Sequence, residues 1–128
     1  MTKFFSKTPI PPYYIVAFSS RRTEGDNGYA EMAKAMEELA LQQPGCLGAE
    51  SARSADGFGI TNSFWKDEAS MKAWKANVDH KLAQKLGREI FYSHYVIRVA
   101  KVERDYSFEK QTCKFDLSIK ASDTTSSF

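Results

Sequence analysis

Apolar residues follow two different spacings along this chain, and the change from one spacing to the other predicts its elements. Tyr13–Ser20 and His94–Glu103 carry apolar residues on both faces of an extended chain, which is typical of strands covered on both sides. Phe58–Trp65 is a third apolar run. Leu47–Ser54 is a weaker strand candidate, because small and polar residues dominate it. Ala55-Asp56-Gly57 lies between the last two and predicts a hairpin turn, because glycine adopts the positive φ that such turns require.

The first helix is predicted over Gly28–Gln43. Apolar residues recur there at every third or fourth position and form one stripe for burial against a sheet, while lysine and glutamate occupy the opposite side. Asp26 or Asn27 is placed to cap the start of this helix, and Pro44-Gly45 ends it.

A second helix is predicted from Asp67 to about Arg88, with Asp67 as its cap and a break near Asn77. Its buried stripe also steps by three or four positions and consists of Met71, Trp74, Val78, Leu82 and Leu86.

The order strand, helix, strand, strand, helix, strand predicts an α+β fold. With right-handed crossovers it gives a ferredoxin-like βαββαβ sandwich with an antiparallel sheet. Two helices cover only one face of a four-stranded sheet, yet the first and last strands are apolar on both faces. The sequence therefore predicts a homodimer in which two such sheets pack together about a two-fold axis.

The chain divides into three parts by composition. Residues 1–12 form an arm, since three prolines disfavour helix there, and residues 13–108 form the domain. Residues 109–128 form a C-terminal extension. Strict alternation of apolar and polar residues predicts an extra strand at residues 113–119.

Charge and cysteine content narrow the function classes. Eighteen basic and sixteen acidic residues give a formal charge of +2, so neither nucleic acid nor an anionic membrane is an expected partner. No stretch approaches the roughly 20 apolar residues of a membrane helix, and the first residues lack the apolar centre of a secretory signal. Two distant cysteines in a chain with a good core favour a reducing, cytoplasmic location.

No cofactor or metal is expected from the spacing of polar residues. The two histidines and two cysteines are scattered rather than placed as ligands. Gly57 and Gly59 belong to a hairpin between strands and do not precede a helix, so they do not form a phosphate-binding loop.

Six residues are candidates for a small-molecule site between the sheet and the second helix. Trp74 suits stacking on a flat ligand, although a tryptophan at helical spacing serves equally as core. Asn62 has apolar neighbours on its strand face and suits a substrate carbonyl or a backbone group. His80 suits proton transfer, or a plain position on the polar side of its helix. Aromatic residues are expected to wall the site: Phe64, Tyr92 and Tyr14.

Tyr13 to Tyr106 resembles the antibiotic biosynthesis monooxygenase family. The resemblance is carried by YYIVAFSSRRTEGDNGYAEM, by QQPGCLGAES, and above all by W-K-x-x-x-x-H at Trp74–His80 followed by A-Q-K-L-G-R-E at Ala83–Glu89. It implies a dimeric α/β barrel built from two ferredoxin-like subunits. Some members of the family are oxygenases that use neither metal nor flavin and act on polycyclic phenols, and others degrade haem.

The haem-degrading branch fits this chain poorly. The resemblance to it would require an asparagine on the first strand, a tryptophan on the second helix and a histidine ten residues later. Trp74 matches, but Ser19 stands near the first position and Gln84 at the third.

The sequence therefore predicts a cofactor-independent monooxygenase that oxidises a small aromatic or phenolic compound with O2. His80 and Asn62 are its expected catalytic residues. A non-enzymatic, dimeric small-molecule-binding or stress-associated module is the alternative, and a haem-binding or haem-degrading protein is less favoured.

Overall fold

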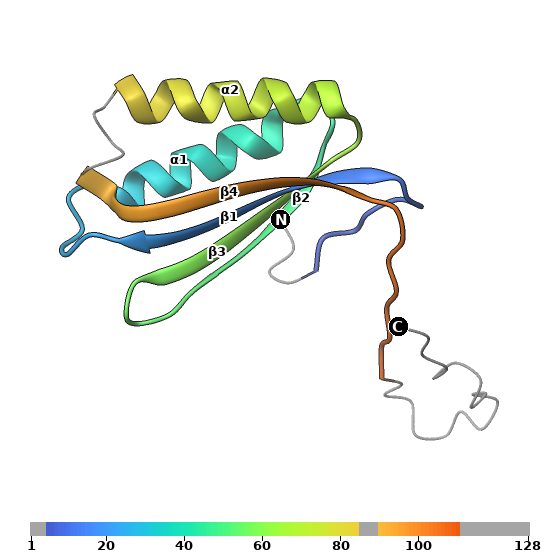
Figure 1. Ribbon diagram of the computed structural model, residues 1–128, viewed down its shortest axis with the longest axis horizontal. Helices are drawn as coiled ribbons and strands as arrows, with labels where there is room; N and C mark the ends of the chain where they lie inside the picture. Colours follow the sequence, from blue (N-terminus) through green and yellow to red (C-terminus); the bar gives the residue numbers. More distant parts are fainter. Residues whose placement is uncertain (1–4, 85–89, 111–128) are drawn as a thin grey trace.

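A computed structural model describes residues 5–84 and 90–110 of the chain (Figure 1). Six elements follow one another as predicted. They are β1 (Tyr13–Arg22), α1 (Tyr29–Gln42), β2 (Cys46–Arg53), β3 (Phe58–Trp65), α2 (Glu68–Gln84) and β4 (Tyr92–Val102). The predicted strand at 113–119 lies outside the described residues.

The four strands form one antiparallel sheet in the order β2-β3-β1-β4. Both helices lie on the same side of it (Figure 1). This arrangement confirms the predicted ferredoxin-like α+β sandwich. The face of the sheet away from the helices carries no helix, and we call it the open face.

The strand register decides which side chains meet the helices. Val16 pairs with Ser63 on β3 and Val99 on β4, and Val16 is buried under the helices. Because side chains alternate along a strand, Thr61, Ser63 and Trp65 share this face. Their neighbours on β3 therefore lie on the open face: Phe58, Ile60, Asn62 and Phe64.

The core is centred on two stacked tryptophans. Trp65 is 0% exposed, and its ring lies 5.8 Å from that of Trp74 with 23° between the ring planes. The buried indole N–H of Trp65 donates to Ser63 Oγ at 2.9 Å, which satisfies its one polar atom. Val16, Ala40 and Met71 complete this cluster.

Local signals set the boundaries of the helices. Asp26 accepts hydrogen bonds from the N–H groups of Gly28 and Ala30 at the start of α1. Asp67 accepts one from the N–H of Ser70 at the start of α2. These contacts confirm the predicted cap at Asp67 and select Asp26 over Asn27 at α1. The predicted break near Asn77 is wrong, because α2 runs through it without interruption.

The hairpin and the end of α1 rely on glycines. Gly57 has φ +95° in the turn between β2 and β3, and its N–H donates to the carbonyl of Ser54 at 3.0 Å. Gly45 has φ +87°, and an added Cβ there would lie 2.3 Å from Ser70 Oγ. Gly45 thus ends α1 and also lets α2 approach closely.

The two ends of the described chain extend along and beyond the open face. The N–H of Ser6 donates to Glu50 on β2 at 2.8 Å, so the arm crosses one edge of this face. Residues 103–110 leave the sheet as an extended segment (Figure 1). Near its start, Asp105 accepts a hydrogen bond from the hydroxyl of the buried Tyr13.

Candidate functional site

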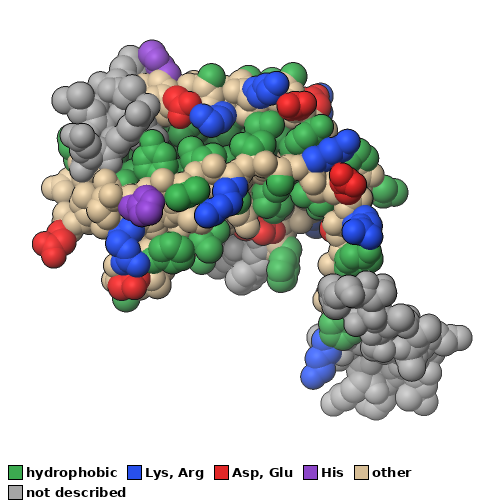
Figure 2. All heavy atoms as spheres, in the orientation of Figure 1, with side chains coloured by type: hydrophobic (Ala, Val, Ile, Leu, Met, Phe, Trp, Pro, Cys, Tyr) green, Lys and Arg blue, Asp and Glu red, His purple; other side chains and the backbone are tan. Residues whose placement is uncertain are grey.

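A pocket of about 420 Å³ lies between the helices and the sheet. Hydrophobic side chains gather on the surface between α2 and β4 (Figure 2). All six elements contribute to the wall of the pocket. The lining residues used below are Tyr29, Ala33, Arg53, Trp74, Lys75 and Tyr92.

One end of the pocket is apolar and rigid. Trp74 is 7% exposed, lines the pocket and stacks on Trp65 beneath it. Met36 and Val78 pack against the same cluster from the two helices and also line the pocket. A buried, stacked indole at a cavity wall offers a flat surface to an aromatic ring. Trp74 therefore belongs to both the core and the pocket.

The other end of the pocket is aromatic and polar. Tyr29 of α1 and Tyr92 of β4 meet edge to face with ring centroids 5.8 Å apart. Tyr92 also packs on Phe18 and Tyr95. Burial raises the pKa of Tyr92 well above its ordinary value, and the charge and hydroxyl of Tyr29 raise it further. Tyr92 is thus a neutral hydrogen-bonding group at every physiological pH.

Two arginines surround the ring of Tyr29 at this polar end. The Arg22 guanidinium lies 3.8 Å from the ring centroid and donates to the backbone carbonyls of Phe91, Gly25 and Asp26. Arg53 donates from Nη2 to the Tyr29 hydroxyl at 3.1 Å and to Ser20 Oγ at 2.8 Å. These contacts fix the ring of Tyr29 and present its hydroxyl to Arg53.

The structure brings two of the six predicted site residues into the pocket, namely Trp74 and Tyr92. Tyr14 shares the helix-facing side of β1 and packs against the tryptophan core, but it does not line the pocket.

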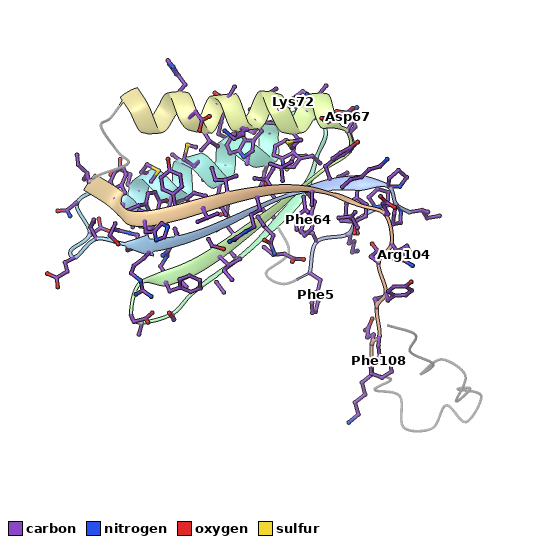
Figure 3. The ribbon with its side chains drawn as sticks, in the orientation of Figure 1. Phe5, Phe64, Asp67, Lys72, Arg104 and Phe108 are labelled. Atoms are coloured by element: carbon purple, nitrogen blue, oxygen red, sulfur yellow. The ribbon has the colours of Figure 1, made fainter. Side chains whose placement is uncertain are left out.

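The other three predicted site residues lie apart from the pocket. Asn62 and Phe64 are on the open face, where Phe64 meets the buried ring of Tyr13 edge to face (Figure 3). His80 is exposed on α2. The predicted grouping of Phe64 and Asn62 with Trp74 and Tyr92 is corrected by the strand register, which places the two pairs on opposite sides of the sheet.

Sequence reasoning missed the polar end of the pocket. Tyr29 fits the buried stripe of its helix, and Arg53 ends a weak strand, so neither stands out alone. The hairpin register does contain a signal, because a turn at residues 55–57 pairs Arg53 with Gly59. An arginine side chain opposite a glycine can lie across the neighbouring strand, because the glycine has no side chain to block it.

Neither a metal-binding cluster nor a membrane-spanning helix is found in the described part of the chain. Within residues 5–84 and 90–110, no three His, Cys, Asp or Glu side chains come together in a way that could hold a metal ion. Over the same residues, no helix is both long and apolar enough to cross a membrane.

Comparison with known proteins identifies relatives over most of the chain. The sequence model of the antibiotic biosynthesis monooxygenase family matches residues 12–86. An uncharacterised protein of Bacillus subtilis, YqjZ, is 48% identical over 112 residues, which cover 88% of this chain and 98% of that protein.

Solved structures share the fold at low sequence identity. SnoaB, a cofactor-independent oxygenase from Streptomyces nogalater, is 9% identical with a TM-score of 0.60 over 73% of this chain and 95% of its own. A protein of unknown function from Nitrosomonas europaea, NE2512, is 12% identical with a TM-score of 0.62 over 80% of this chain and 100% of its own. From its sequence match and its fold, this chain belongs to the antibiotic biosynthesis monooxygenase family.

Proposed function

We propose that the protein is a cofactor-independent monooxygenase that oxidises a small, flat phenolic compound with O2 in the pocket beside Trp74. The observation that carries the proposal is the pocket itself. It has about 420 Å³, a stacked indole at one end and two tyrosine side chains at the other. Such a site suits a polycyclic phenol, whose rings and hydroxyl groups need opposite environments.

The proposed reaction converts a ring CH2 next to a phenolic system into a carbonyl. A proton of the substrate passes to water, and the electron-rich anion transfers an electron to O2. The two radicals combine at the ring carbon as a peroxide anion. This anion takes a proton back from water to become a hydroperoxide, which then loses water to give the carbonyl. One oxygen atom ends in the carbonyl and the other in water, so the four electrons lost by the carbon are those gained by O2. The chain's part is to hold the rings against Trp74 and to keep bulk water away from the reacting carbon.

Oxygen uptake with dithranol, a dihydroxyanthrone, tests this proposal. We expect the protein, dialysed against a chelator, to raise O2 consumption and quinone absorbance above those of a protein-free blank. Rates equal to the blank for dithranol and for other anthrones would contradict the proposal. Binding without oxygen uptake would favour a non-enzymatic small-molecule-binding module instead.

Two alanines of α1 provide a matched pair of variants. Ala33 lines the pocket, whereas Ala35 is exposed on the same helix and does not line it. Both sites accept leucine without loss of helix propensity. We expect Ala33→Leu to fill part of the pocket and lower turnover, and Ala35→Leu to leave it unchanged. Equal effects of the two would show that the reaction occurs elsewhere.

We propose further that two copies form a dimeric α/β barrel through their open faces. Phe58 and Ile60 are exposed on this face, at 40% and 43%, and no helix covers them. An apolar sheet face of this kind is stabilised by a matching one. A cytoplasmic location stays a prediction from the cysteine content.

A further inference from the structure

Arg53 brings a positive charge to the polar end of the pocket. Glu37 also lines the pocket, but among the described residues it forms no ion pair with Arg53. The Arg53 guanidinium donates to the carbonyl of Gly57, to Ser20 Oγ and to the Tyr29 hydroxyl. All three acceptors are uncharged. Among residues 5–84 and 90–110, no acidic side chain forms an ion pair with Arg53. Two of its five N–H groups make no hydrogen bond with those residues, namely Nε–H and one on Nη1.

The guanidinium of Arg53 lies in the space left by the missing side chain of Gly59. Gly59 pairs with Arg53 across the β2–β3 hairpin, and an added Cβ at Gly59 would lie 2.6 Å from Arg53 Cζ and 2.9 Å from Nε. Only the absence of a side chain at Gly59 lets the guanidinium lie across the strand toward Ser20. Arg53 is an exposed residue, but the hairpin register and its three hydrogen bonds set the position of its charge.

The other cations near the pocket are Arg22, Lys75 and Lys34, and each differs from Arg53 in its contacts. Arg22 donates to five acceptors on its own loop and on Phe91. Lys75 pairs with Asp79 at 2.8 Å on α2. Lys34 also lines the pocket and is exposed, as Arg53 is, but Arg53 is the one that donates to the Tyr29 hydroxyl. Arg53 is therefore the cation best placed to receive an anion beside the tyrosine hydroxyls.

We propose that the pocket selects aromatic acids, with Arg53 binding the ligand carboxylate while the rings lie toward Trp74. A free N–H of the guanidinium can donate a charge-assisted hydrogen bond to a carboxylate, which is stronger than one between neutral groups. The side chains of Tyr29 and Tyr92 lie at the same end of the pocket and provide hydroxyl groups next to the carboxylate. This inference rests on the proposed function for its pocket and adds the substrate class and a residue that determines it.

Binding of matched acid and amide ligands tests the inference. Isothermal titration calorimetry with naphthoate and anthracene carboxylate is compared with titration of their primary amides, which have the same shape without the charge. We expect the acids to bind about 10- to 100-fold more tightly than the amides, the range for hydrogen bonds to a charged group. Arg53→Gln is expected to remove this preference and leave amide binding unchanged.

Arg21 provides the matched control. Arg21 lies near the end of β1 on the open face and pairs with Asp56 at 3.8 Å. It does not line the pocket. Arg21→Gln removes the same net charge, and we expect it to keep the preference for acids. Because attraction to an accessible charge is screened by ions, acid affinity should fall with added salt in the parent protein and not in Arg53→Gln.

A second variant displaces the guanidinium without removing it. Gly59→Ala places a methyl group 2.6 Å from Arg53 Cζ, which is too close for contact, so the flexible side chain must move away. We expect acid affinity to fall while net charge and amide affinity stay the same. This variant keeps the test valid if Arg53→Gln fails to fold.

Several results would overturn the inference. Equal affinity of the parent protein for acids and amides would remove it while leaving the monooxygenase proposal in place. A parallel loss of acid and amide binding in Arg53→Gln would show that Arg53 only supports the hairpin. Loss of the preference in Lys34→Gln instead would assign the anion to another cation. Absence of any binding by acids and amides would count against both proposals.

Discussion

At the scale of single residues, one side chain can serve the core and the site together. Trp74 is nearly buried, stacks on Trp65 and still forms a wall of the pocket. Its two roles follow from its size, because an indole fills the core with one face and leaves the other to a ligand. Substitutions at Trp74 must therefore change stability and binding at once.

Trp74→Ala is expected to lower the free energy of unfolding by about 3 to 5 kcal/mol, as truncation of a buried aromatic residue does. Urea denaturation followed by circular dichroism measures it. Lys72→Ala on the exposed side of the same helix serves as the control, since it removes only a surface pair with Glu68. A loss below about 1 kcal/mol for Trp74→Ala would contradict its place in the core.

The residues of the candidate site were only partly predictable from the sequence. Trp74 was found because helical spacing and tryptophan chemistry agree. Asn62 and Phe64 were assigned to the pocket because their strand face is the more apolar one. That face instead lies away from the helices, since both faces of β3 carry large side chains and the alternation alone does not say which one the helices cover. Arg53 was missed because a single arginine at a strand end resembles any surface cation.

At the scale of elements, short-range signals were the most reliable. The bounds of β3 agree with prediction at both ends, because a glycine turn precedes it and a helix cap follows it. The predicted break in α2 is wrong because asparagine has only a mild cost in a helix, which the strong helix propensity of the neighbouring alanines and lysines outweighs. Weak local preferences thus yield to packing, whereas caps and turns do not.

The cap of α2 leads to a prediction about pH. The N–H of Ser70 donates to Asp67 and, with the Ser70 hydroxyl, holds the pKa of this carboxyl below its ordinary value of 3.8. The folded protein therefore binds this proton less readily than the unfolded chain does. The stabilisation is complete above pH 3.8 and is lost as the pH falls through the lower folded value.

We expect Asp67→Asn to be less stable than the parent protein at pH 7, and we expect the difference between them to shrink below pH 3.8. Thermal melting at a series of pH values measures both. A difference between the two proteins that stays constant down to pH 2 would show that the charge at Asp67 does not stabilise the helix.

At the scale of the whole molecule, the sheet has two faces with separate tasks. The helix-facing side holds the tryptophan core and the pocket. The open face holds exposed apolar residues, and Ser6 of the arm lies over it near Gly48 and Glu50. A second copy would cover the rest without closing the pocket from the other side.

Two isoleucines of equal exposure test this assembly. Ile60 on the open face and Ile90 before β4 are each 43% exposed. We expect the parent protein to sediment as a dimer at micromolar concentration, Ile60→Glu as a folded monomer, and Ile90→Glu as a dimer. A monomeric parent protein would remove the proposed dimer and leave the pocket proposal unaffected.

The alternation of β3 has an evolutionary consequence. Thr61 and Ser63 contribute to the pocket, while Ile60 and Asn62 belong to the opposite surface, so neighbours in the sequence are under unrelated selection. A lineage can exchange every second residue of this strand and acquire new chemistry without altering the open face, which we propose as the dimer interface. Such independence would allow one scaffold to diversify widely among bacteria while its quaternary architecture is inherited intact.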